Sequence, residues 1–413
     1  MSYTFLDLQS EVKRRSTLDQ GGTTFDTAVK NLINFSLFRI ANEAPWRALR
    51  RTDRISTNGD YTTGTVTTVL DSKTWTGSGT SWLTTANATK GRRAKITSST
   101  TASNKLFTID TITVDTTLTT VEAYNVTGAA SLSYKILGQE IYTLPIQTSR
   151  PAILWHEAYG YPYAMNFITD RSFFDEGYDF STSGIPTHYK MWGEDWIINQ
   201  PKAGSVMRIA SSSSADTSKK VTVFGTVSGY PDYEEITTNA SNGTTAASGS
   251  KTFTSVERIT KDSSTTGRIT VDADSANTTI AVLPVGDTTG GIMYKKVQLW
   301  PPPDATYYIN VWYYKEPYRL VNDNDVHELG PDFDELIVLM AAAKLNTQQS
   351  KKEAKDFFAM FKDEIRVLRR KNADRLDWLP RLQRHSDIGR GRSGLHKSLS
   401  YSQVGQFYGP SSF

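Results

Sequence analysis

The sequence predicts an α+β fold in which helices at both ends of the chain enclose a long antiparallel β region. Apolar residues recur at helical spacing near the N-terminus and again after residue 330, whereas Thr, Ser and β-branched residues alternate with period two between them. Helices from the two ends of a chain can pack into one layer. We therefore expect a helical layer, β domains that project from it, and an extended C-terminal tail.

Residues 1–54 contain two predicted helices. Thr4 and Asp7 have the spacing of a capping box, which predicts the start of the first helix. After a pair of glycines, the second helix is expected to be capped by Thr24 and to end before Pro45. Its apolar stripe consists of Val29, Leu32, Ile33, Leu37, Ile40 and Ala41. A stripe of this width predicts burial against other helices.

Antiparallel β structure is predicted for residues 55–204 and 286–330, with a second β domain inserted between them at 205–285. Runs such as 106–114 and 220–227 alternate in period two, and Gly or Asn separates many of them. We interpret the insertion as a small β-sandwich.

An aromatic-rich stretch at 141–201 lies within the first β region. It contains Trp192 and Trp196 on either side of Glu194 and Asp195, a combination that superficially resembles a sugar-binding cleft. Packed aromatic side chains are the favoured interpretation of this pattern.

Residues 331–379 are predicted to form a helical hairpin. The first helix has Leu336, Ile337, Met340 and Ala343 on one face, and a capping box from Ser350 to Glu353 opens the second. The apolar stripe of the second helix is Phe357, Phe358, Phe361, Ile365 and Leu368. Its basic end contains Arg366, Arg369, Arg370, Lys371 and Arg375. Cations there complement the helix dipole, so a solvated face is the default interpretation and contact with DNA is the alternative.

The C-terminal segment 380–413 is rich in Gly and Ser and too poor in apolar residues to form a core. Ordering such a segment costs about 1–2 kcal/mol of backbone entropy per residue, which favours a tail that docks on a neighbouring chain. Folding back on its own domain and nonspecific binding of nucleic acid are the alternatives. The residues expected to dock are Arg381, Arg384, Arg390, Arg392, Leu395, Leu399, Tyr401, Phe407, Tyr408 and Phe413.

Patterns typical of catalysis or of cofactor and metal binding are not expected to make a site here. The chain has no cysteine, its five histidines lack HxxxH spacing, and no Walker or GxSxG motif occurs. Six carboxylates cluster between residues 323 and 335, but their spacing is not that of a calcium loop, and a solvated turn at a helix N-terminus explains them. The net charge of +3 gives no overall attraction to nucleic acid or membrane. We expect no enzyme activity, no cofactor and no metal.

Two blocks of sequence resemble the head-to-tail connector, or adaptor, proteins of tailed bacteriophages. The first block contains TFLDLQSEVKRR and FDTAVKNLINFSLFRIANEAPWRALRR. The second contains QLWPPPDATYYINVWYYKEPYRLVNDNDVHELGPDFDELIVLMAAAKLN and KKEAKDFFAMFKDEIRVLRRK. The resemblance lies in the texture and order of these blocks and not in a catalytic fingerprint. The chain differs from the smallest connectors in its size and in the inserted domain.

This resemblance implies a virion protein at the head-tail junction, synthesised in the cytoplasm of a host bacterium. It implies a ring of twelve copies beneath the portal protein that extends the DNA channel toward the tail or further neck proteins, without sequence-specific DNA binding and without a membrane. In such connectors a C-terminal segment commonly reaches along the portal. A tail or receptor-binding protein with a glycan site in 141–201 is the alternative, and a polysaccharide depolymerase is a third.

Overall fold

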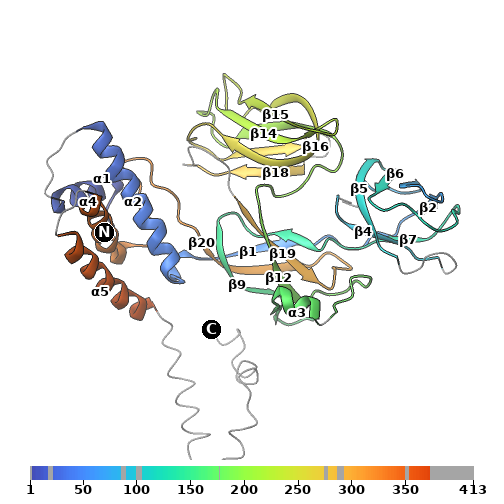
Figure 1. The fold of residues 1–413 in the computed structure, drawn as a ribbon, viewed down its shortest axis with the longest axis horizontal. Coiled ribbons are helices and arrows are strands. Elements are labelled where there is room, and N and C mark those ends of the chain that lie inside the picture. Colours follow the sequence, from blue (N-terminus) through green and yellow to red (C-terminus); the bar gives the residue numbers. More distant parts are fainter. Residues whose placement is uncertain are drawn as a thin grey trace, which may run out of the picture. The chain divides into compact units, whose positions relative to one another are not determined.

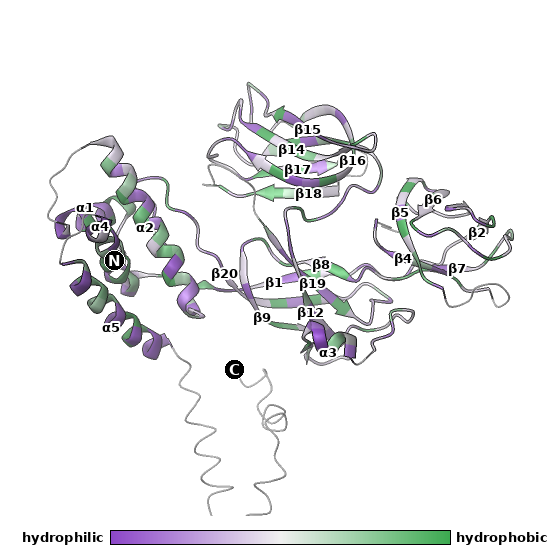
Figure 2. Ribbon diagram, in the orientation of Figure 1, coloured by the Kyte–Doolittle hydropathy of each residue, from purple (hydrophilic) through white to green (hydrophobic). Residues whose placement is uncertain are grey.

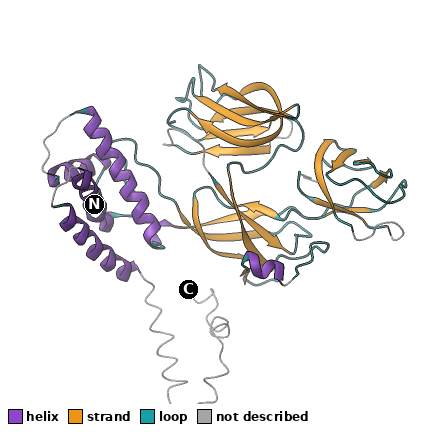
Figure 3. Cartoon of the chain, in the orientation of Figure 1, coloured by secondary structure: helices purple, strands orange, loops and turns teal. Residues whose placement is uncertain are grey.

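A computed structural model describes residues 2–16, 22–84, 90–98, 105–175, 177–273, 278–285, 293–348 and 353–372. Within these ranges the chain forms two compact units (Figure 3). The helical unit combines residues up to Arg50 with those from Tyr314 onward, and the β unit comprises Arg51–Tyr313. The architecture agrees with the predicted α+β class, and strands outnumber helices.

Four helices build the helical unit around one hydrophobic core. They are α1 (Phe5–Arg15), α2 (Thr23–Glu43), α4 (Asp334–Gln348) and α5 (Ala354–Asn372). The 3₁₀ turns η1 (Arg47–Leu49) and η3 (Pro331–Phe333) lie beside them in the sequence. α1 and α2 pack on each other and on α4, and α5 packs on α4. Residues 336–343 of α4 are apolar around the whole helix, and all of them are buried. Residues from both ends of the chain therefore share one core.

The starts of the two N-terminal helices differ. At α1 the predicted capping box is confirmed, because Asp7 N–H donates to Thr4 Oγ1 and Thr4 N–H donates to the Asp7 carboxylate. The prediction that Thr24 caps α2 is wrong. Gly22 occupies the N-cap position with φ of 154°, a conformation open to glycine. No side chain of the described residues caps the helix. The capping box predicted from Ser350 falls partly outside the described residues.

The buried stripe of α5 is narrower than the sequence predicts. Phe361, Ile365 and Leu368 are buried, whereas Phe357 is only half-buried and Phe358 is exposed. Hydrophilic and hydrophobic residues alternate along this helix (Figure 2). Three large apolar side chains therefore remain accessible on α5, namely Phe358, Met360 and Val367.

One part of the β unit is a six-stranded sheet in the order β2-β3-β6-β5-β4-β7. Its strands are β2 (Thr65–Thr68), β3 (Thr74–Ser78), β4 (Arg93–Ile96), β5 (Phe107–Val114), β6 (Thr117–Thr120) and β7 (Tyr134–Ile136). Trp75, Trp82 and Tyr124 are fully buried in its core. Arg92 is also buried and donates to the carbonyl oxygens of Gly59 and Leu137. These bonds join the two ends of the segment, and burial lowers the pKa of Arg92 to about 10.

Two four-stranded sheets share a second core in this unit. One has the order β1-β20-β9-β10, with β1 (Arg50–Ser56), β9 (Thr148–His156), β10 (Tyr163–Ala164) and β20 (Tyr308–Lys315). The other has the order β11-β12-β19-β8, with β8 (Ile141–Thr143), β11 (Asn166–Phe167), β12 (His188–Asp195) and β19 (Tyr294–Trp300). The short helix α3 (Asp170–Asp175) lies between β11 and β12 in the sequence.

The inserted segment forms a six-stranded antiparallel sheet with its own core. Its strands are β13 (Ser205–Ser211), β14 (Lys220–Val227), β15 (Tyr230–Thr237), β16 (Ala247–Lys261), β17 (Ile269–Ala273) and β18 (Thr278–Leu283), in the order β15-β14-β16-β13-β17-β18 (Figure 1). All six strands belong to one hydrogen-bonded sheet, because the 15-residue strand β16 pairs with β13 through its first half and with β14 through its second. The arrangement of this sheet as a small β-sandwich stays a prediction. Phe253 lies where the two pairings meet.

Candidate functional site

The loop at residues 321–326 joins the second half of the chain to the start of α1. Phe5 N–H donates to Asp325 O at 2.8 Å, and Leu6 N–H donates to Asp323 O at 3.0 Å. An isolated antiparallel bridge also pairs Thr4 with Val326. The first turn of a helix has backbone N–H groups without partners inside the helix, and this loop accepts two of them. The N-terminus and the loop thus form one surface.

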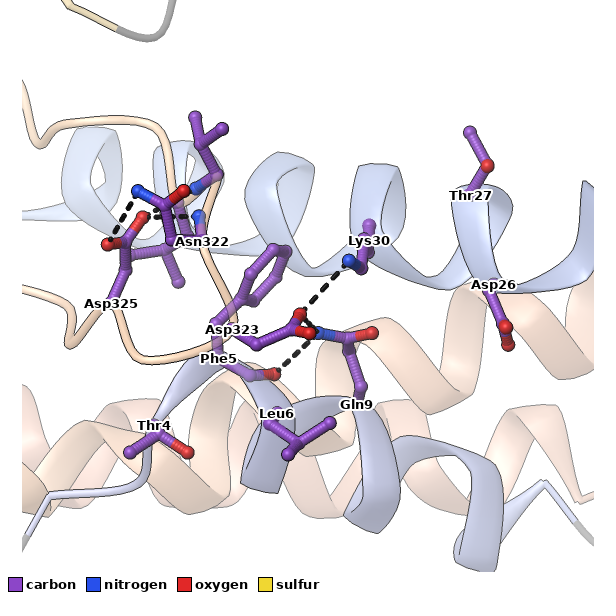
Figure 4. Close-up of polar contacts among 12 residues, drawn as sticks. Thr4, Phe5, Leu6, Gln9, Asp26, Thr27, Lys30, Asn322, Asp323 and Asp325 are labelled. Carbon is purple, nitrogen blue, oxygen red and sulfur yellow. Dashed lines mark hydrogen bonds and ion pairs between the residues drawn. The ribbon is translucent and has the colours of Figure 1, made fainter. Parts of the chain in front are cut away.

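The carboxylates of this loop contact α1, α2 and the loop itself (Figure 4). Asp323 accepts from Lys30 Nζ at 3.0 Å and from Gln9 Nε2 at 3.3 Å. Hydrogen bonds from Lys30 and Gln9 lower the pKa of Asp323. Asp325 accepts the backbone N–H groups of Val321 and Asn322 at 2.7 Å each. Asp323 therefore stays charged at neutral pH, and the hydrogen bonds of both side chains hold the loop in shape.

The remaining carboxylates of the 323–335 cluster also have partners. Glu328 pairs with Lys315 at 2.7 Å, Asp332 with Lys371 at 2.6 Å, and Glu335 with Arg15 at 2.5 Å. These contacts support the structural interpretation of the cluster. Among the described residues, no group of three or more His, Asp or Glu side chains is arranged to hold a metal ion.

His327 and Asp334 form a buried pair beside this surface. The sequence analysis did not predict this pair. His327 Nε2 is 2.6 Å from Asp334 Oδ1, while Asp334 Oδ2 accepts the Tyr3 N–H at 2.9 Å. Burial lowers the pKa of His327, although Asp334 acts in the opposite direction. The histidine is therefore neutral at pH 7 and its Nε2–H donates to the carboxylate. Seven residues separate the two side chains, so no short spacing motif marks the pair.

Four of the predicted basic residues of α5 are described by the structure. They lie in the last two turns of the helix and are exposed, namely Arg366, Arg369, Arg370 and Lys371. Arg369 pairs with Glu43 at 2.6 Å, and Lys371 pairs with Asp332. Arg366 and Arg370 lie on the exposed arc of the same helix. Two of the four cations thus contribute to contacts within the helical unit. The predicted docking residues of the tail, from Arg381 to Phe413, lie outside the described residues, as does Arg375.

A groove of about 640 Å³ lies between α4 and α5. Its lining residues are Ala343, Lys344, Thr347, Ala354, Lys355, Phe358, Ala359 and Lys362, which we call the lysine groove. Among the residues that the structure describes, the lining includes three lysines and no carboxylate. Sequence analysis missed it, although Lys355, Phe358, Ala359 and Lys362 follow the i, i+3, i+4, i+7 spacing of one helix face.

The aromatic stretch of the β unit contributes to a second pocket, of about 610 Å³. Trp192 and Lys190 line it, and Trp192 is 53% exposed. Glu194 pairs with Lys295, and Asp195 pairs with Lys296 at 2.6 Å, across neighbouring strands. The two carboxylates therefore form cross-strand ion pairs.

Residues 215–385 match the family model of the SU10 adaptor protein. The match covers less than half of the chain and indicates a phage adaptor-type protein with a structural role in the virion. No curated protein matches the chain. In the part of the chain that the structure describes, no helix is long and apolar enough to cross a membrane.

The residues that the family model matches differ from the two sequence blocks that resemble connector proteins. It includes β20, the 321–326 loop, α4 and α5, which belong to the second resembling block. It also includes β14–β18 of the insertion, which the resemblance left out as a departure from the smallest connectors. The first 54 residues lie outside the match. Five of the six described strands of the inserted sheet, β14–β18, therefore lie within the matched region, whereas β13 precedes it.

Proposed function

We propose that this protein is a head-to-tail connector that forms a ring of twelve copies beneath the portal and extends the DNA channel toward the tail. The observation that carries the proposal is the adaptor match over β20, the 321–326 loop, α4 and α5. The 321–326 loop, α4 and α5 share a core or hydrogen bonds with α1 and α2, so these matched elements and the N-terminal helices belong to one helical unit. That unit is the layer proposed to form the ring, with the β unit making outward contacts.

The position and symmetry of the protein in virions test this proposal. An antibody against the chain should label the junction of head and tail, and cryo-electron microscopy of that junction should show twelvefold density with the helical unit in the ring. Labelling at the distal end of the tail, or threefold density, would contradict the connector role and favour the receptor-binding alternative.

The tail, residues 380–413, is proposed to dock on the portal. Its arginines would form charge-assisted hydrogen bonds with acidic or carbonyl groups there, while its aromatic residues act as apolar anchors. We expect a chain truncated after Leu379 to fold normally but to leave heads that neither retain DNA nor acquire tails. In a full-length variant, Gln replaces Arg381, Arg384, Arg390 and Arg392. This variant keeps the length of the tail and removes the positive charge of these four arginines, so it separates the two contributions to docking. Normal joining of heads and tails by the truncated chain would exclude the docking role.

The basic end of α5 is proposed to face DNA in the channel. Arg366 and Arg370 are the stronger candidates, because Arg369 and Lys371 already pair with carboxylates. Replacing both with Glu should alter the rate of DNA ejection without affecting assembly. The matched control is Arg14→Glu at the end of α1, which is also exposed. Equal ejection rates for the wild type and the α5 variant would count against a channel position.

The alternative of a tail or receptor-binding protein rests on one observation, the exposed Trp192 in the 610 Å³ pocket. A tryptophan platform beside amide side chains is a common way to bind a sugar ring. Adsorption of virions carrying Trp192→Ala to host cells tests it, and unchanged adsorption would exclude the glycan site.

A further inference from the structure

Two surfaces of the helical unit have complementary chemistry. The first, which we call the acidic face, consists of Tyr3, Leu6, Asp7, Asp323, Asp325 and Val326. Leu6 is 51% exposed and Val326 is 50% exposed, and the loop contacts described above hold them beside each other. Three carboxylates on this face stand against one lysine, Lys30, which leaves it negative.

The second surface is the lysine groove. Its apolar part includes Ala354, which is buried, and Phe358, which is 39% exposed. The Lys362 ammonium lies 4.9 Å from the centre of the Phe358 ring, and that of Lys344 lies 5.4 Å from the centre of the Phe35 ring. Lys344 and Lys362 thus border aromatic surface, and the described lining gives the three lysines of the groove no carboxylate. A partner that brings apolar side chains and negative charge would fit this groove.

We propose that the acidic face of one copy of this chain docks in the lysine groove of the next copy. This inference rests on the proposed function, since it assigns the two faces by which the ring closes. A ring needs two different, complementary patches on each subunit, and a contact of one patch with the other can repeat around an axis. The acidic face lies on α1 and the 321–326 loop, whereas the groove lies on α4 and α5. One subunit can therefore use both at once.

The chain offers a clean cross-linking test because it has no cysteine. Leu6→Cys places a thiol on the acidic face, and Ala359→Cys places one in the groove. On mild oxidation of assembled protein, the two single variants should form a disulfide-linked dimer only when mixed. The double variant should give a ladder of covalent oligomers that ends at the ring number. The control pairs Leu6→Cys with Val69→Cys, an exposed site in the β unit, and should give no dimer.

A charge exchange tests the same contact without covalent bonds. Asn324→Lys adds a positive charge to the acidic face, and Lys355→Glu adds a negative charge to the groove; both residues are exposed. Each single change should weaken self-association about tenfold or more at low salt, and the double variant should recover most of it. Arg39→Glu, an exposed charge change on α2 outside both surfaces, is the control.

The outcomes separate the docking from the proposed function. Assembly without the Leu6–Ala359 cross-link, and without any effect of the charge changes, overturns the docking and leaves the ring intact. A wild-type chain that stays monomeric at every concentration and in the presence of tail-less heads contradicts the ring itself.

Discussion

The helical unit and the β unit are built by different rules. In the helical unit, α1 and α2 at the start of the chain share a core with α4 and α5 near its end. Hydrogen bonds such as that from Tyr3 N–H to Asp334 span most of the sequence. In the β unit, the sheet of β2–β7 and the sheet of β13–β18 each form a core from one continuous stretch. The core of the helical unit therefore cannot form until both ends of the chain are present. Each of these two β segments can form its core from residues that are near one another in the sequence.

This difference has a consequence for adaptation. A locally closed segment can be enlarged or replaced without disturbing its neighbours, because its chain entry and exit lie close together. In the β2–β7 segment, Arg92 fixes that exit by bonding to Gly59 and Leu137. The helical unit lacks this freedom, since a change in one helix reaches the others through α4. We expect surfaces for self-assembly in the helical unit and more variable outward contacts in the β unit.

The largest expected effect is the loss of Phe361, which should break the helical unit alone. The side chain is buried in the core shared by both chain ends, so Phe361→Ala should cost about 3–5 kcal/mol of folding free energy. Helical circular dichroism at 222 nm during chemical unfolding follows this unit, because the β unit contains only one short helix among its described residues. Phe358→Ala, three residues away on the exposed side, is the control and should change stability little. Equal losses for the two variants would contradict the shared core.

A smaller effect is expected in the β unit from Asp216→Asn. The carboxylate is buried and accepts hydrogen bonds from Ser211 Oγ at 2.6 Å and from the backbone N–H groups of Thr266 and Gly267 at 2.7 Å each. Burial alone would raise the pKa of Asp216, but these bonds lower it overall. An amide has only one acceptor oxygen, so the variant cannot accept all of these hydrogen bonds. Its free energy of unfolding should fall by about 1–3 kcal/mol.

Hydrogen exchange of the backbone amides of β13–β18 would measure the loss in the Asp216 variant, because residues 205–285 contain no tryptophan. The signal at 222 nm is the reference for the helical unit. The control is Asp232→Asn on β15, a half-buried residue that pairs with Lys251. We expect the midpoint of the unfolding transition at 222 nm to be the same in both variants as in the wild type. A shift of that transition by Asp216→Asn would show that the two units unfold as one.

Local patterns in the sequence predicted the elements of this fold well. The Thr4 and Asp7 capping box, the apolar stripe of α2 and the strand at β20 all follow from spacing within about 20 residues. Helix starts that depend on backbone conformation could not be predicted from such spacing. Gly22 begins α2 through its own dihedral angles, and no side-chain motif marks such a start.

The candidate surfaces depend on pairings that no local pattern contains. The lysine groove needs the register of α4 against α5, which brings Lys344 beside Lys355. The acidic face needs residues 321–326 to meet α1 across more than 300 residues of chain. The sequence also predicted Phe358 to be buried, because an apolar residue at helical spacing looks the same whether its neighbour is its own core or another subunit. The boundaries of the domains as folding units remain predictions.

The smallest expected effect is a difference in pH dependence between the units. Burial lowers the pKa of His327 in the helical unit, so as the pH falls the unfolded chain binds a proton before the folded one does. The helical unit should therefore lose stability as the pH drops below about 6.5, the ordinary pKa of histidine, by on the order of 1 kcal/mol. His327→Gln can still donate to Asp334 and does not titrate, so it should flatten this dependence in thermal melts followed at 222 nm. His156 of the β unit, whose pKa burial also lowers, provides the comparison. His156→Gln should leave the 222 nm melts as pH-dependent as in the wild type, and a dependence that persists in His327→Gln would assign it to other groups.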